Sequence, residues 1–254
     1  MTRESAVRVV TLYPDLLGTY GDGGNATVLT QRLAWRGYEV ECMNVNGGDV
    51  IPSQADLYVM GGGEDAPQVE AAGEIGRDGP LHRALEGGAV MLAVCAGMQI
   101  VGRTFPDAAG HTRDGAALLD IETVRVDRPR AVGELLVAPD PDLGLPALTG
   151  FENHGGRTRL GEGVQPLGLV EIGEGNGGGT EGAVRGHVLG TYLHGPVLAR
   201  NPALADLLLR WATGDALAPL DDTEEEALHR ERVRAARQNE LAPRRSWKDV
   251  IRRG

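Results

Sequence analysis

The cysteine at position 95 is the residue whose surroundings best suit covalent chemistry. It follows the apolar run Ala89–Val94 and precedes the small residues Ala96 and Gly97. A buried parallel strand that turns sharply into a helix has this pattern, and the turn lifts the side chain out of the sheet toward a substrate. The N-terminus of the following helix favours the thiolate, which is the nucleophilic form of cysteine. These neighbours favour a nucleophile over a thiol that is simply packed in the core.

A nucleophilic thiol needs a base that takes its proton and later protonates the leaving group. Among the six histidines, His194 ends an apolar run and precedes Gly195-Pro196. This places it at the sheet edge where Cys95 is expected, so we predict that sulfur and imidazole meet there. His154 is the second candidate. His187 begins the same run as His194, and we expect it at the opposite end of the sheet.

Acyl transfer also needs hydrogen-bond donors for the oxyanion of the tetrahedral intermediate. The backbone N–H of Ala96 follows the nucleophile directly and is one candidate. The second is the N–H of Gly63, in the Gly61–Gly63 triplet that ends a neighbouring strand-like run. Glycine allows the backbone angles that turn an amide toward a site, although a glycine triplet also suits a plain strand-to-helix loop.

The first half of the chain alternates strand and helix signals, as expected for a parallel sheet with helices on both faces. The predicted strands are Val7–Tyr13, Tyr38–Asn44, Ala55–Met60 and Ala89–Val94, and the predicted helices are Asn25–Trp35, a segment containing Leu81–Leu85, and later Pro202–Ala212. Ligands of such sheets bind at the carboxyl ends of the strands. Both Gly61–Gly63 and Cys95 fall at that edge.

After Gly102 the predicted strands are separated by glycine- and proline-rich turns. These strands are Leu119–Asp127, Gly133–Ala138 and Leu167–Ile172, with a glycine-rich loop at Gly173–Gly179 and a last strand within 187–194. We therefore predict an α/β fold with a flavodoxin-like, parallel-to-mixed sheet, helices on both faces and a second, more antiparallel layer in the same domain.

The composition changes after residue 214, which divides the chain into a main domain at 1–214 and a charged tail at 215–254. Residues 221–237 predict a helix with acidic residues first and basic residues last, which complements the helix dipole. A solvated surface helix is the expected role. The alternative is a docking element anchored by Trp247.

The composition excludes several classes of function. The formal net charge of −11 argues against a nucleic-acid partner, and no apolar run is long enough to span a membrane. The first residues lack the apolar core of a signal peptide, so we expect a cytoplasmic protein. Of the two cysteines, Cys42 has the pattern of a strand edge and a structural role. The sequence contains no Cys-x-x-Cys and no His-Glu-x-x-His motif, so we do not expect a metal site.

Three sequence blocks resemble the class I (triad-type) glutamine amidotransferases. They are Met60-Gly-Gly-Gly-Glu-Asp65, Ala93-Val-Cys-Ala-Gly-Met-Gln99 and Thr191-Tyr-Leu-His-Gly-Pro196. Within this class the sequence resembles the CobB/CobQ-like, or cobyric-acid-synthase-like, branch, and in it the GatD-like glutaminase subunits of lipid II isoglutaminyl synthase. The segments 12–25 and 151–158 support this closer resemblance, which extends from about Val7 to Ala212.

The resemblance implies hydrolysis of glutamine to glutamate and ammonia through a thioester on Cys95, with His194 moving the proton. It also implies that Gln99 and the 153–156 segment, Asn153 and Gly155 in particular, hold the substrate. Arg130 resembles an arginine at the site entrance that binds the α-carboxylate of glutamine. Gln99 equally suits a helix residue that faces its neighbours, and Arg130 a surface arginine.

One position departs from the pattern of many relatives, which have a glutamate two residues after the histidine. Here that residue is Pro196, so the third catalytic group must come from elsewhere. The resemblance implies a MurT-like Mur-ligase subunit as partner, whose acid could approach His194. ATP and a metal ion are expected on that subunit and no cofactor on this chain. The implied acceptor of ammonia is D-glutamate in the stem peptide of lipid II, which becomes D-isoglutamine.

Three other functions suit parts of this pattern. One is a glutaminase subunit of another synthase, in the corrin or pyridoxal-phosphate pathway. A second is a non-catalytic, amidotransferase-like scaffold, against which the intact Cys95, His194 and glycine triplet argue. A third is another Cys–His hydrolase on a similar sheet, such as a peptidase.

Overall fold

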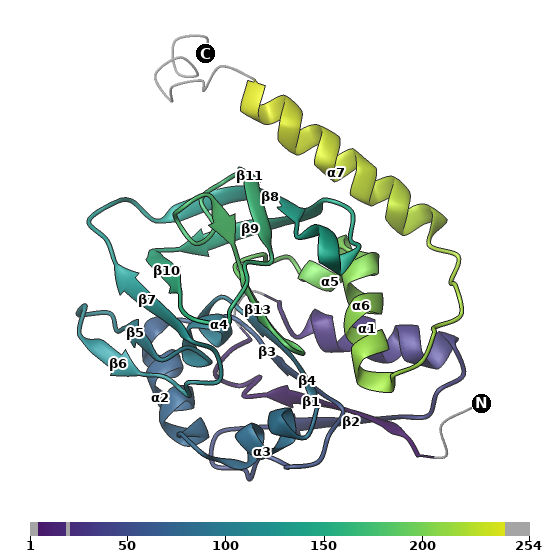
Figure 1. The fold of residues 1–254 in the computed structure, drawn as a ribbon, viewed down its shortest axis with the longest axis horizontal. Helices are drawn as coiled ribbons and strands as arrows, with labels where there is room; N and C mark the ends of the chain where they lie inside the picture. Colours follow the sequence, from purple (N-terminus) through teal and green to yellow (C-terminus); the bar gives the residue numbers. More distant parts are fainter. Residues whose placement is uncertain (1–4, 19–20, 242–254) are drawn as a thin grey trace, which may run out of the picture.

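A six-stranded sheet forms the centre of the computed structural model, which describes residues 5–18 and 21–241 (Figure 1). The strand order is β13-β14-β4-β3-β1-β2, and all neighbouring strands are parallel except β13 and β14. The strands are β1 (Val7–Leu12), β2 (Val40–Val45), β3 (Leu57–Met60), β4 (Val90–Val94), β13 (Ala183–Arg185) and β14 (Val188–Thr191). The order of the parallel strands is that of flavodoxin-like sheets.

Helices cover both faces of this sheet. The connection from β1 to β2 runs toward one edge of the sheet, and the connection from β3 to β4 runs toward the other edge. Since such crossovers are right-handed, the helices of these two connections lie on opposite faces. On one face α1 (Gly24–Trp35) packs against α6 (Pro202–Thr213), and on the other α2 (Asp65–Ile75) packs against α4 (Ala96–Ile100). The remaining helices of this part are α3 (Pro80–Glu86) and α5 (Val197–Arg200). The predicted flavodoxin-like α/β fold is confirmed.

Burial on both faces explains why the central strands could be recognised in the sequence. Every residue of β3, β4 and β14 is buried, so these strands consist almost wholly of apolar residues. The edge strand β2 is mostly exposed, and Cys42 lies on it with its side chain exposed. The carboxyl ends of β1, β3, β4 and β14 meet at one edge, where the winding direction reverses.

The more antiparallel layer consists of two small sheets instead of one (Figure 1). Their strand orders are β10-β7-β5-β6 and β12-β11-β8-β9. The bounds are β5 (Thr104–Pro106), β6 (Thr112–Asp114), β7 (Ile121–Arg125), β8 (Ala131–Pro139), β9 (Leu148–His154), β10 (Gly156–Leu160), β11 (Gly168–Ile172) and β12 (Thr180–Glu181), with a 3-10 turn at Pro141–Leu143. The layer divides because the chain leaves one sheet after β9 and enters the other at β10, with only Gly155 between them.

The predicted charged helix is present as α7 (Thr223–Leu241), which lies across β8, β9 and β11 (Figure 1). Buried Arg32 of α1 fixes the segment that precedes it, with bonds of 2.8 Å to Asp206 and 2.6 Å to Asp222. Arg237 on α7 also bonds Glu171 of β11 at 2.8 Å. The tail is therefore tied to the main domain, while the division at residue 214 stays a prediction. Trp247 lies outside the described residues.

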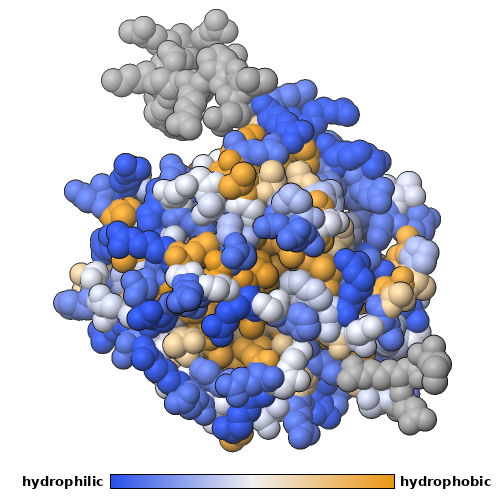
Figure 2. Space-filling model, in the orientation of Figure 1, coloured by the Kyte–Doolittle hydropathy of each residue, from blue (hydrophilic) through white to orange (hydrophobic). Residues whose placement is uncertain are grey.

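The surface shown in Figure 2 is largely hydrophilic, and α7 exposes mainly hydrophilic residues there. Apolar residues gather near the centre of this face, between charged side chains. Within residues 5–18 and 21–241, no helix combines the length and the apolar character needed to cross a membrane.

Candidate active site

Cys95 occupies the sharp turn between β4 and α4. Its φ of 51° and ψ of −104° are unusual for a residue with a side chain. The turn is held by bonds on both sides of the thiol: the Cys95 N–H donates to Thr191 O at 2.8 Å, and the Gln99 N–H donates to Cys95 O at 3.0 Å. Strained backbone of this kind is retained where surrounding structure fixes it, often at functional sites. The strand, sharp turn and helix that the sequence predicts around Cys95 are therefore present.

His194 lies beside Cys95, with its imidazole fully buried. Nδ1 of its ring is 3.0 Å from Oδ2 of Asp22, whose side chain is also fully buried. Burial alone lowers the pKa of His194, but hydrogen bonds to Asp22 and to the Cys95 thiol outweigh it and raise the pKa to about 9. A histidine that is protonated at neutral pH next to a thiol favours an imidazolium–thiolate pair.

Asp22 is the third group that Pro196 cannot supply. It comes from the Gly21-Asp-Gly-Gly loop that follows β1, so the acid belongs to this chain. Nδ1 of the ring therefore faces a carboxylate of this chain, whereas the approach of a partner subunit's acid to His194 stays a prediction. The sequence offered one signal for Asp22: it is a carboxylate in a glycine-rich loop after a strand that ends at the same sheet edge.

Gly62 is required by the close packing of Cys95, His194 and Asp22. A Cβ atom on Gly62 would lie 2.8 Å from Cε1 of His194, 3.1 Å from Oδ2 of Asp22 and 3.3 Å from Cβ of Cys95. Its backbone N–H donates to Oδ2 of Asp22 at 2.9 Å. Since this N–H is occupied, Gly63 and Ala96 remain the predicted oxyanion donors.

A pocket of about 540 Å³ opens over the thiol. Its lining includes Cys95 and every predicted oxyanion or substrate residue, namely Gly63, Ala96, Gln99, Arg130, Asn153 and Gly155. The structure thus brings together residues from four separate segments of the sequence. His194 is fully buried behind the thiol and does not line the pocket. The roles of the lining residues in binding a substrate stay predictions.

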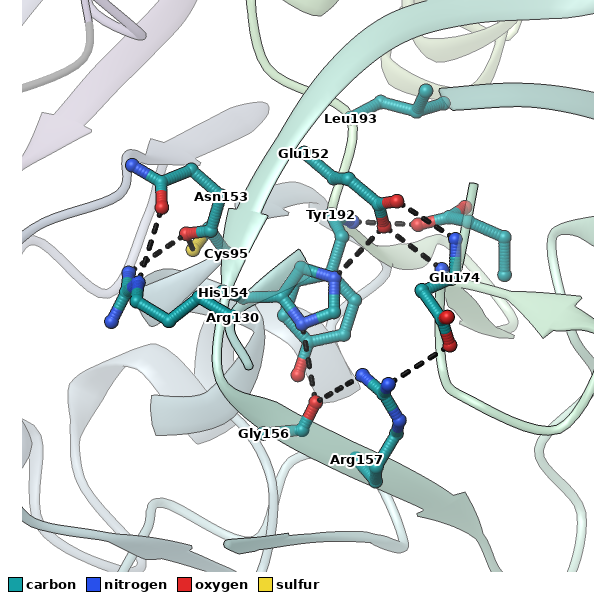
Figure 3. Close-up of polar contacts among 12 residues, drawn as sticks. Cys95, Arg130, Glu152, Asn153, His154, Gly156, Arg157, Glu174, Tyr192 and Leu193 are labelled. Carbon is teal, nitrogen blue, oxygen red and sulfur yellow. Dashed lines mark hydrogen bonds and ion pairs between the residues drawn. The ribbon is translucent and has the colours of Figure 1, made fainter. Parts of the chain in front are cut away.

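Arg130 and Asn153 form one wall of this pocket, and Figure 3 shows them next to Cys95. Arg130 donates through Nε to Oδ1 of Asn153 at 3.2 Å and through Nη2 to its backbone oxygen at 3.1 Å. The same backbone oxygen lies 4.0 Å from Sγ of Cys95. The guanidinium is exposed, so one side of it is available to a carboxylate of a bound amino acid.

Gln99 lies on the pocket floor as part of a chain of hydrogen bonds. Its Oε1 accepts from Nε2 of Gln68 at 2.9 Å, and its Nε2 donates to the Tyr192 hydroxyl at 3.2 Å. Tyr192 continues this chain to Thr158 at 2.7 Å. The amide of Gln99 is thereby held in one orientation. Sequence reasoning missed Gln68 and Tyr192, because nothing in their spacing marks them as neighbours of Cys95.

The two other candidate histidines lie elsewhere. His187 is at the opposite end of the sheet, as expected, where its ring stacks on Trp211 with centroids 5.3 Å apart. His154 lines the pocket, but its ring nitrogens face Glu152 and the backbone oxygen of Gly156 at 3.0 and 3.1 Å. Of the three, His194 is the histidine that pairs with the thiol.

Comparisons with known proteins find relatives among glutamine-hydrolysing subunits and cobyric acid synthases. Subunit GatD of the glutamine-hydrolysing lipid II isoglutaminyl synthase from Staphylococcus aureus (strain N315) is 35% identical over 202 residues, which is 78% of this chain and 81% of that protein. GatD from Streptococcus pneumoniae (strain ATCC BAA-255 / R6) is 31% identical, over 81% of this chain and 80% of that protein. A cobyric acid synthase from Rhodobacter capsulatus is 33% identical, over 61% of this chain and 32% of that protein.

A solved structure shares the fold. A glutamine amidotransferase from Thermotoga maritima superimposes with a TM-score of 0.50 at 16% identity, covering 92% of this chain and 99% of that chain. The family model of the CobB/CobQ-like glutamine amidotransferase domain matches residues 8–202, a range that includes Asp22, Cys95 and His194. The chain therefore belongs to the CobB/CobQ-like glutamine amidotransferase family.

Proposed function

We propose that this chain is a glutaminase subunit that hydrolyses L-glutamine and delivers ammonia to a MurT-like ligase subunit. The observation that supports it most is the buried arrangement of Asp22 and His194 behind Cys95, at the end of a pocket lined by Arg130 and Gln99. The two GatD relatives, which match about four fifths of this chain, support the pathway.

The first half of the reaction forms a thioester. The Cys95 thiolate attacks the carboxamide carbon of glutamine, and the N–H groups of Gly63 and Ala96 stabilise the oxyanion of the tetrahedral intermediate. The His194 imidazolium gives its proton to the departing nitrogen, the C–N bond breaks and ammonia leaves. Asp22 holds the imidazole ring in the orientation that this transfer needs and stabilises its charged form.

The second half releases glutamate. His194, now neutral, takes a proton from a water molecule, and the resulting hydroxide attacks the thioester carbon. The second tetrahedral intermediate expels the thiolate as glutamate forms, which restores the thiolate–imidazolium pair. Arg130 binds the α-carboxylate of glutamine, and Gln99, Asn153 and Gly155 complete the pocket around the substrate.

Ammonia is largely ammonium in neutral water and is then no longer a nucleophile, so productive use needs a sheltered route to an activated acceptor. We propose that the partner provides it: a Mur-ligase-like subunit that uses ATP and a metal ion to activate D-glutamate of the lipid II stem peptide, which is converted to D-isoglutamine in the cytoplasm. This chain itself contributes no cofactor in this proposal.

The test begins with the purified chain alone. Incubation with glutamine, asparagine and a peptide mixture should release ammonia and glutamate from glutamine, because the whole Asp22–His194–Cys95 set lies in this chain. Co-purification from the native cell should then recover a Mur-ligase-like protein, and the complex should amidate lipid II with glutamine as the nitrogen source. If no ammonia is released from any of the three substrates, the proposal that this chain hydrolyses glutamine is contradicted. Recovery of a corrin or pyridoxal-phosphate synthase would contradict the pathway.

A further inference from the structure

A second buried pair of ionisable side chains, Glu152 and His154 on β9, lies at the edge of the pocket, which His154 helps to line. Each is 2% exposed, and Oε2 of Glu152 lies 3.0 Å from Nε2 of His154 (Figure 3). Neither side chain takes part in the proposed reaction. A buried charge is costly unless it is paired and hydrogen-bonded, so a buried pair of this kind needs a functional or a structural reason.

The partners of the His154 ring determine its protonation. Nδ1 faces the backbone oxygen of Gly156 at 3.1 Å, and because a carbonyl oxygen can only accept, Nδ1 must carry a proton. Nε2 faces Glu152, whose oxygens also accept from the N–H groups of Glu174 at 2.7 Å and Gly175 at 2.9 Å. These donors favour the ionised carboxylate, which can only accept from Nε2. The geometry therefore corresponds to an imidazolium paired with a carboxylate.

Other charged groups surround this pair. Arg157 of β10 donates to Gly156 O at 3.4 Å and pairs with the Glu174 side chain at 2.9 Å. Buried Glu181, next to β14, interacts with Glu152 electrostatically. Arg130 and Cys95 lie on the other side of the strand, at the pocket (Figure 3).

Two routes connect the pair to the pocket. Asn153 stands between Glu152 and His154 on β9, so the pair fixes the backbone whose oxygen contacts Arg130 at 3.1 Å and lies 4.0 Å from Sγ of Cys95. The His154 ring also stacks on the Tyr192 ring, with centroids 3.8 Å apart and an interplanar angle of 15°. Tyr192 in turn accepts from Gln99 on the pocket floor.

We propose that Glu152 and His154 are positioning residues, which form a buried carboxylate–imidazolium pair that holds the wall and floor of the glutamine pocket in place. The proposal rests on the proposed function, because it names glutamine as the substrate of this pocket. The pair fixes Asn153 and Arg130 through the β9 backbone and Gln99 through Tyr192. Its loss should weaken glutamine binding more than it slows the reacting thiol.

The charge state can be tested without any activity. In the full chain labelled with ¹⁵N-histidine, the NMR signals of His154 are identified by their absence in His154→Gln. At pH 7.5 both ring nitrogens should carry protons, and Glu152→Gln should convert the ring to the neutral form. A neutral His154 in the unaltered chain would overturn the proposal.

Kinetics tests the positioning role. A single substitution also changes the protonation of the partner that remains, so the main variant for kinetics is the double substitution Glu152→Gln/His154→Gln, which keeps hydrogen-bonding groups and removes both charges. We expect its KM for glutamine to rise about tenfold, with kcat reduced less than about threefold. Alkylation of Cys95 by iodoacetamide should keep its rate, since Asp22 and His194 are untouched. The exposed His111→Gln is the matched control and should change none of these values.

The outcomes separate this proposal from the proposed function. An unchanged KM, or equal losses in kcat and in alkylation rate, would overturn the positioning role while glutamine hydrolysis stands. An unaltered chain that releases no ammonia from glutamine would refute the proposed function, and with it the assignment of glutamine to this pocket, whatever the NMR result.

Discussion

Pro196 packs directly against Gly24, so closely that a Cβ atom on Gly24 would lie 2.5 Å from Cγ of the proline. This contact brings the Gly21-Asp-Gly-Gly loop over the His194-Gly-Pro turn, and it places Asp22 3.0 Å from the imidazole. The Asn25 side chain adds a bond to the Leu198 N–H at 3.0 Å. The proline that removes the usual acid thus helps to seat the loop that carries its replacement.

Replacing Asp22 by asparagine should lower kcat for glutamine hydrolysis by about 100-fold or more. The amide is nearly the same size, but it cannot stabilise the imidazolium and can hold the ring in the wrong tautomer. Ammonia release at saturating glutamine measures the effect, and an unchanged thermal unfolding curve controls for folding. Full activity of Asp22→Asn would show that Asp22 is not the third catalytic group.

The pH dependence of the reaction should reflect His194. Because the pKa of His194 is raised to about 9, the imidazolium that protonates the departing nitrogen should persist through neutral pH and be lost above about pH 9. The alkaline limb of kcat/KM should therefore lie near pH 9. In Asp22→Asn it should move to lower pH, since a carboxylate that favours the charged ring is gone. A limb at the same pH in both proteins would contradict this assignment.

Substituting Gly62 by alanine should reduce activity by about 100-fold, because the added methyl group would push apart His194, Asp22 and Cys95. Gly73→Ala is the matched control. Gly73 lies exposed in α2 with nothing near its missing Cβ, so alanine there should leave activity unchanged and stabilise the helix by up to about 1 kcal/mol. Equal activity of the two variants would mean that the three catalytic groups are less closely packed than described.

Cys95→Ser should fold normally and release no ammonia, since a serine hydroxyl at this turn is not ionised by a histidine of this kind. The other thiol provides the control, because Cys42 is exposed on the edge strand β2, far from the pocket lining. Cys42→Ser should keep full activity. Ammonia release by Cys95→Ser at the rate of the unaltered chain would refute the nucleophile.

Glu181 should make the protein less stable as the pH rises. The pKa of Glu181 is raised from 4.5 to about 7, and burial is the largest cause of this shift. Its Oε2 has no hydrogen-bond partner among the described residues. The protonated Glu181 contributes its full share to the free energy of unfolding below about pH 4.5. This share is lost as the pH rises through 7, because the folded state holds the proton more tightly than the unfolded state. The loss is on the order of 3 kcal/mol.

Glu181→Gln removes this titration, so its melting temperature should exceed that of the unaltered chain by several degrees at pH 8. The difference should shrink toward pH 5. Equal differences at both pH values would show that Glu181 does not titrate in this range.

The parallel sheet was predictable because strands buried on both faces are continuous apolar runs. β4 and the thiol that follows it show this best, and the register of β14 next to β4 then brings His194 to the same edge. The helix α2 was missed. It contains Pro67 and Gly73 and has few large apolar residues, so no helical period stands out in its sequence.

The candidate site was only partly predictable for a similar reason. Cys95 and His194 follow strands, so the strands mark their places. Asp22 sits in a loop whose glycines resemble any turn, and its position depends on the distant contact of Gly24 with Pro196. Glu152 and His154 alternate on a strand like surface residues, and only the neighbouring loop 173–175 reveals that they are buried.

The bond between Asp22 and His194 joins residues 172 positions apart along the chain. A ribosome that has completed Cys95 still has to add the whole antiparallel layer before the histidine emerges. During that time the sulfur has no imidazole beside it that could take its proton. The pair of sulfur and imidazole thus forms only after β14 has joined the sheet beside β4.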